Sequence, residues 1–166
     1  MKEYLAKQVA SIKQREAKAL EALKQGFVRE YVAVADAAVD KLLLLIFASK
    51  TSLSEYHAET LYKTGATEGA KLAEFLLQTG ALTEKERNKV REFKNYRNYV
   101  LHQHEGEWSA LIMKNRALAK RSSDAEPSEK ELETLGLTPG DFAEHAAKHL
   151  QAAHDLVALL CSKASA

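Results

Sequence analysis

Arginine, asparagine and histidine gather in one short stretch of the chain, which reads R-N-Y-V-L-H from Arg97 to His102. A guanidinium group stays protonated in proteins and can bind a phosphate through two parallel hydrogen bonds. An imidazole titrates near neutral pH, so it can take up or release a proton during a reaction. Asn98 and His102 are four residues apart, so their side chains can touch on a helix. These residue types suit the binding of an anion together with the movement of a proton.

Arg97 interrupts an otherwise mostly apolar stripe. Each residue of a straight helix advances by about 100°. Six side chains then fall on one face: Val90, Phe93, Arg97, Val100, Leu101 and His104. Burying an unpaired guanidinium is strongly unfavourable, so Arg97 must either meet an acidic partner or face a polar cleft. Asp36 and Asp40 are the candidate partners, either in a purely structural ion pair or in one that holds Arg97 in position for catalysis.

The stretch from Arg97 to His102 resembles the R-N-x-x-x-H signature of HEPN domains, an all-α superfamily many of whose members are RNA-cleaving toxins. The resemblance implies a homodimer in which both motifs line one cleft, and an endoribonuclease that needs no metal or other cofactor. The 2′-hydroxyl group of the RNA would attack the adjacent phosphate. His102 would act as general base or acid, and Arg97 would stabilise charge in the transition state. Asn98 would orient the histidine or the phosphate.

One position next to the motif departs from the toxins that a partner nucleotidyltransferase silences. Those toxins carry a tyrosine two residues after the motif histidine, where this chain has His104. Silencing by tyrosine modification is therefore not expected, although a different antitoxin protein remains a candidate partner, and His104 is a candidate supporting residue. Some HEPN domains are non-catalytic. The alternative function is therefore a helical module that binds a nucleotide or a partner protein.

Aromatic and basic side chains near the motif are candidates for contact with RNA. Tyr96 and Tyr99 flank the motif and would stack on bases; the alternative is that they pack half-buried in the protein. Two basic clusters could steer a phosphate backbone, although such clusters are commonly a solvated helix face. The residues singled out in them are Arg91, Lys94, Lys114 and Arg116.

Histidines near the C-terminus have a spacing that metal ligands can use. His145 and His149 are four residues apart and so share one helix face. No third ligand is evident, so we predict no metal site and interpret both as surface histidines. Cys161 is the single cysteine, which excludes an intramolecular disulfide, and we interpret it as a core residue.

The composition predicts an all-α fold around these residues. The chain of 166 residues has only 7 Gly and 2 Pro, and 46% of it is hydrophobic. It is also rich in Ala, Leu, Lys and Glu, which are strong helix formers. The formal net charge of +1 gives no global field toward nucleic acid or membranes. No apolar run could span a bilayer and no signal peptide is evident, so we expect a cytoplasmic protein without a membrane partner.

Apolar periodicity predicts one domain over residues 1–166, a mostly antiparallel bundle of four long helices with shorter ones. The first helix is amphipathic, and its apolar stripe from Leu5 to Leu23 is a candidate surface for pairing with another protein. The second, over Phe27–Ser49, is apolar on nearly every side and is expected at the centre of the bundle.

Capping signals predict where the other helices begin and end. Ser52 and Glu55 form a capping box, as do Thr83 and Glu86. The helices that these boxes open end near Thr79, before a stop at Gly80, and at His102 or slightly beyond. Gly65 and Gly69 would let a neighbour approach the third helix closely. Three further elements follow: a helix over Trp108–Lys120, an exposed loop near 121–130, and a helix from Pro139 to about Cys161.

Overall fold

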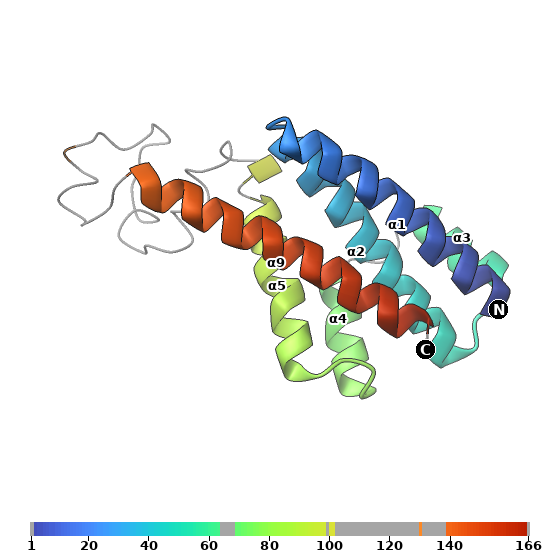
Figure 1. Ribbon diagram of the computed structural model, residues 1–166. Coiled ribbons are helices and arrows are strands. Elements are labelled where there is room, and N and C mark those ends of the chain that lie inside the picture. The colour runs from blue at the N-terminus through green and yellow to red at the C-terminus, as the bar shows by residue number, and fades with distance from the viewer. Residues whose placement is uncertain (1, 64–68, 99, 102–129, 131–138, 166) are drawn as a thin grey trace.

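The computed structural model describes residues 2–63, 69–98, 100–101, 130 and 139–165. Within these ranges six helices pack into one body and no strand occurs (Figure 1), which confirms the all-α prediction. The helices are α1 (Lys2–Lys24), α2 (Val28–Thr51), α3 (Glu55–Lys63), α4 (Gly69–Gln78), α5 (Glu84–Asn98) and α9 (Pro139–Ser165).

Helix α2 lies at the centre of this body and packs against each of the other described helices. Five consecutive side chains, from Leu42 to Ile46, are each at most 2% exposed. A helix can bury every side in this way only if neighbours cover it all round. The central position predicted for the second helix is therefore confirmed.

Helix α1 packs along α2 and α9 and uses its apolar stripe to do so (Figure 1). Leu5, Val9 and Ile12 are all at most 7% exposed. Most of the stripe is thus part of the protein's own core, and its predicted pairing with another protein could involve only the edge that lines an open groove beside α2. The same face carries Glu16, which is buried and whose Oε1 lies 3.0 Å from Nδ1 of His154 on α9.

The capping box at the start of α5 is present as predicted. Thr83 Oγ1 accepts a hydrogen bond from the Glu86 amide at 3.3 Å, and Glu86 Oε2 accepts one from the Thr83 amide at 2.7 Å. Gly80 adopts a φ of +72° after the end of α4, a conformation that favours glycine. The predicted stop at Gly80 is therefore confirmed.

The other predicted capping box is wrong by two residues. Ser52 does not begin a helix but ends α2, in a left-handed conformation with a φ of 54°. Ser54 caps α3 instead: its Oγ accepts a hydrogen bond from the His57 amide at 3.3 Å and lies 2.7 Å from His57 Nδ1. A histidine thus stands where the predicted box has Glu55.

Several predicted features fall partly or wholly outside the described residues. These are Gly65, the helix over Trp108–Lys120, and the loop near 121–130 apart from Lys130. The last helix starts at Pro139 as predicted and continues past Cys161 to Ser165, and Cys161 is buried as predicted. No described helix combines the length and the apolar character that crossing a membrane requires.

Gly69 brings α4 close to the polar side chains between α2 and α5. A Cβ atom built on Gly69 would overlap the Asp40 carboxylate, whose Cγ would lie 3.1 Å away, and would lie 3.1 Å from Cε of Lys94. The close approach that the sequence predicted is present at this glycine. Any larger residue must push the Asp40 carboxylate away from its position.

We therefore expect Gly69→Ala to lower the free energy of unfolding by about 1 to 3 kcal/mol, because the added methyl group overpacks this contact. Helix propensity alone would predict the opposite sign. Urea denaturation of the single variant and of Gly69→Ala/Asp40→Ala tests the cause. In the Asp40→Ala background, Gly69→Ala should lower the free energy of unfolding by much less. If it lowered the free energy equally in both backgrounds, overpacking against Asp40 would not be the cause.

Candidate functional site

Arg97 lies in the last turn of α5 and faces α2, where it meets Asp36. Its Nε donates a hydrogen bond to Asp36 Oδ2 at 2.8 Å, and its Nη2 lies 2.8 Å from the same oxygen. Its Nη1 donates to Oδ1 of Asn98 at 2.8 Å. The acidic partner that the sequence required for this arginine is therefore present. Two of the three predicted catalytic residues, Arg97 and Asn98, are in direct contact.

Lys94, one turn earlier on α5, joins the same cluster. Its Nζ lies 2.6 Å from Asp36 Oδ1 and 2.6 Å from Asp40 Oδ1. One oxygen of Asp36 thus contacts Lys94 and the other contacts Arg97, and these two cations come from successive turns of α5. We call the four side chains Asp36, Asp40, Lys94 and Arg97 the α2–α5 charge cluster. Its two cations balance its two carboxylates.

The position of Lys94 corrects one expectation from the sequence. Its side chain is only 16% exposed and its ammonium group lies between two carboxylates. Lys94 is therefore engaged inside the protein and is not the phosphate contact that the basic cluster suggested. Arg91, on the same helix, is exposed as that prediction requires. The spacing of Lys94, three residues before Arg97, could have predicted this contact, because it puts both side chains on one helix face.

Burial is graded across the α2–α5 charge cluster. The side chain of Asp36 is 10% exposed, whereas those of Arg97 and Asp40 are 27% and 32% exposed. Burial raises the pKa of Asp40, although the hydrogen bond and charge of Lys94 act to lower it. Asp36 raises the same pKa further, because two carboxylates share this cluster. Arg97 is thus anchored at a buried carboxylate while part of its side chain reaches solvent.

The spacing of charged residues on the two helices explains this contact. Asp36 and Asp40 are four residues apart on α2, and Lys94 and Arg97 are three apart on α5. Each pair therefore lies on one face of its helix. Since α2 and α5 pack against each other, the acidic pair meets the basic pair.

Tyr96 lies on a different face of α5 and contacts α9. Its ring is fully buried and stacks on that of His149, with centroids 4.7 Å apart and an interplanar angle of 10°. Burial raises the pKa of Tyr96 to about 12. Its hydroxyl group has no hydrogen-bond partner among the described residues. The prediction that Tyr96 stacks on RNA bases is therefore wrong, and the packing alternative holds.

His149 has a structural role in that stack, so it is not simply a surface histidine. It also lines a cavity of about 260 Å³ between α5 and α9 with Phe93 and Tyr96. Among the residues with described side chains, no group of three or more His, Cys, Asp or Glu is placed to hold a metal ion. The side chain of His145 lies outside that set.

The described residues that follow Tyr99 in the motif are wound differently from α5. Val100 and Leu101 form a π-helical turn, in which Val100 is fully buried. The carbonyl oxygen of Leu101 accepts a hydrogen bond from Arg29 Nη2 of α2 at 3.0 Å. A π turn closes hydrogen bonds between residues five apart and is frequent at functional sites. This hydrogen bond joins Leu101 to α2.

The remaining predicted site residues lie outside the described part of the chain. They are Tyr99, His102, His104, Lys114 and Arg116, and their roles stay predictions. Comparison of the chain with models of known protein families, with curated proteins and with solved structures gives no match.

Proposed function

We propose that the protein is a metal-independent endoribonuclease of the HEPN type, acting as a homodimer and as the toxin of a toxin–antitoxin or phage-defence system. The observation that carries the proposal is the anchoring of Arg97. Its guanidinium group is held by Asp36 and Asn98 at the end of α5, while its side chain stays 27% exposed. A cation fixed before the substrate arrives stabilises developing charge without reorganising.

The spacing of the motif also supports the proposal. The arginine and the histidine of R-N-x-x-x-H are five residues apart. Five residues is the span of one π-helical hydrogen bond, and a π turn covers Val100 and Leu101 within the motif. In a regular α-helix, residues five apart diverge by well over a quarter turn. Where a π turn replaces part of an α-helix, this divergence is smaller.

The proposed reaction uses only groups of the RNA and of the protein. The 2′-hydroxyl oxygen attacks the adjacent phosphorus and loses its proton to His102 of one protomer. The bond between phosphorus and the 5′ oxygen breaks, and the leaving oxygen takes a proton from the second His102 of the dimer. Arg97 stabilises the extra negative charge on the phosphate oxygens. The products are a 2′,3′-cyclic phosphate and a 5′-hydroxyl end.

The same contact also favours a second function, a non-catalytic helical module. Asp36 contacts both Nε and Nη2 of Arg97. The two positive and two negative charges of the α2–α5 charge cluster also balance one another without any ligand. Arg97 would then serve only as a structural ion-pair partner, and the protein would bind a nucleotide or another protein.

RNA cleavage by the purified protein in the presence of a chelator separates the two functions. We expect cyclic-phosphate products from the wild type and a strong loss of cleavage in His102→Ala. In a separate growth assay, induction of the wild type should arrest bacterial growth, whereas induction of His102→Ala should not. His57→Ala, which changes an exposed histidine on α3, should cleave like the wild type. Intact RNA with folded wild-type protein would reject the ribonuclease and leave the binding module.

A further inference from the structure

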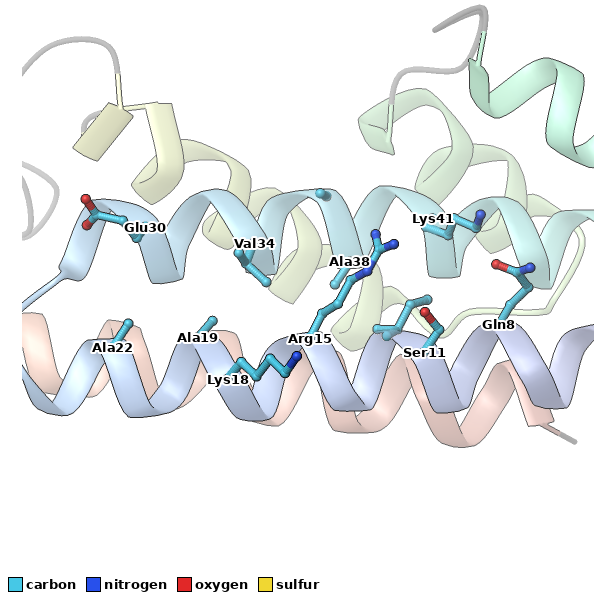
Figure 2. Close-up of a pocket in the computed structure, with 12 residues that line it drawn as sticks. Gln8, Ser11, Arg15, Lys18, Ala19, Ala22, Glu30, Val34, Ala38 and Lys41 are labelled. Atoms are coloured by element: carbon cyan, nitrogen blue, oxygen red, sulfur yellow. The ribbon is translucent and has the colours of Figure 1, made fainter.

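An open groove lies between α1 and α2, facing away from α9 (Figure 2). Its volume is about 430 Å³. Its apolar lining consists of Ile12, Val34 and four small side chains, those of Ala19, Ala22, Ala37 and Ala38. Ala37 stands exposed in the groove wall. We call this feature the α1–α2 groove.

The charges that line the α1–α2 groove are mostly positive. Arg15, Lys18 and Lys41 contribute three cations, and Glu30 is the one carboxylate. In Figure 2 the Arg15 side chain extends from α1 toward α2, and Glu30 lies toward one end of the row of labelled residues. Neither Arg15 nor Lys18 has an ion-pair partner within the described ranges. The apolar floor is therefore bordered by an excess of positive charge.

Lys41 is partly buried at this groove and has charged neighbours of both signs. Burial lowers its pKa, Glu59 opposes that shift, and Arg15 and Lys63 lower the pKa further. Like charges thus gather where part of the surrounding water is already excluded. A carboxylate placed beside Arg15 would offset the repulsion between Arg15 and Lys41.

The length of the α1–α2 groove indicates the shape of its occupant. The lining residues on α1 run from Gln8 to Ala22, which corresponds to about 21 Å along a helix axis. That length is close to four helical turns. A straight groove between two packed helices can accommodate a row of side chains from a third helix.

We propose that the α1–α2 groove binds an amphipathic helix of a partner protein, with a small apolar stripe on the floor and carboxylates toward Arg15 and Lys18. This is the helix-in-groove mode of recognition. A second copy of this chain is the poorer occupant, because a symmetric pair would set the same excess of cations opposite itself. The inference does not depend on RNA cleavage.

The test uses a displayed library of helical peptides of about four turns. All members share one stripe of Ala and Leu, and the flanking positions are randomised. Selection on the purified full-length protein should enrich Asp and Glu in the flanks. The best acidic peptide, labelled with fluorescein, is then titrated against the wild type and against variants, with fluorescence anisotropy as the measurement.

Matched variants locate the binding. Ala37→Trp fills the groove and should weaken binding at least tenfold, whereas Ala33→Trp, at an exposed α2 position outside the lining, should not. Lys18→Glu should weaken binding more than Lys13→Glu, although both change the net charge equally and both residues are exposed. Peptides without acidic flanks, or binding that Ala37→Trp leaves unchanged, would overturn the proposal. So would a dimer of the free protein that Ala37→Trp alone dissociates, since the occupant would then be a second copy.

Discussion

Replacing Arg97 by alanine is expected to lower the rate constant of RNA cleavage by about 10²- to 10³-fold, the usual effect of removing a group that stabilises transition-state charge. Arg97→Lys should recover only part of this loss. An ammonium group keeps the charge but lacks the planar fork that Asp36 and Asn98 hold through Nε and Nη1. Single-turnover cleavage of a 5′-labelled RNA measures the rate constant, and circular dichroism checks the helical fold.

Arg15→Ala is the matched control for this prediction. It also removes an arginine, but from the α1–α2 groove on α1 and not from the end of α5. Its cleavage rate should equal that of the wild type. If Arg97→Ala also cleaved at the wild-type rate, Arg97 would be only a structural partner of Asp36, and the catalytic centre would lie elsewhere.

Local signals explain why much of the fold could be predicted from the sequence. The capping box at Thr83 and the stop at Gly80 depend on residues within one turn of each other. The error at Ser52 shows the limit of such signals. Two serines two residues apart both suit a helix start, and the end of α2 decides between them, because the Leu53 amide donates to the Ala48 carbonyl. Ser52 is thereby used in closing α2.

The candidate site could be predicted where a physical requirement applied to a single residue. An arginine in an apolar stripe needs an acid, and the apolar second helix offers Asp36 and Asp40. Which cation each of these two carboxylates contacts could not be predicted, because that depends on the register of α5 against α2. The prediction that Tyr96 stacks on RNA bases was wrong for a similar reason. Helix α5 packs against both α2 and α9, so a second face of it is buried, which its one apolar stripe does not reveal.

The carboxylate of Asp36 contacts both cations of the α2–α5 charge cluster, so its removal is expected to change the stability of the protein strongly. Asp36→Ala is expected to lower the free energy of unfolding by about 2 to 3 kcal/mol, less than for a fully buried pair because Lys94 and Arg97 stay partly exposed. Removing the shared acid leaves two neighbouring cations, with Asp40 as the one carboxylate of the cluster. Urea denaturation of the wild type and the variant measures the difference.

Asp40→Ala is the matched variant for Asp36→Ala. Asp40 contacts only Lys94 within the cluster, its side chain is 32% exposed, and burial raises its pKa. Its ionised form is therefore less favoured in the folded protein, and its loss should lower the free energy of unfolding by no more than about 1 kcal/mol. Equal losses for both variants would contradict the central place given to Asp36.

A double-mutant cycle joins the stability of this cluster to its proposed activity. Asp36→Ala and Arg97→Ala should be less than additive in unfolding free energy, since each removes the same contact. If Asp36 also positions Arg97 for cleavage, Asp36→Asn should lower the rate constant in folded protein and have little further effect once Arg97 is alanine. A purely structural Asp36 would lower stability but leave the rate constant of the folded fraction unchanged. The rate constant of folded Asp36→Asn therefore decides whether the pair is part of the catalytic machinery or of the core alone.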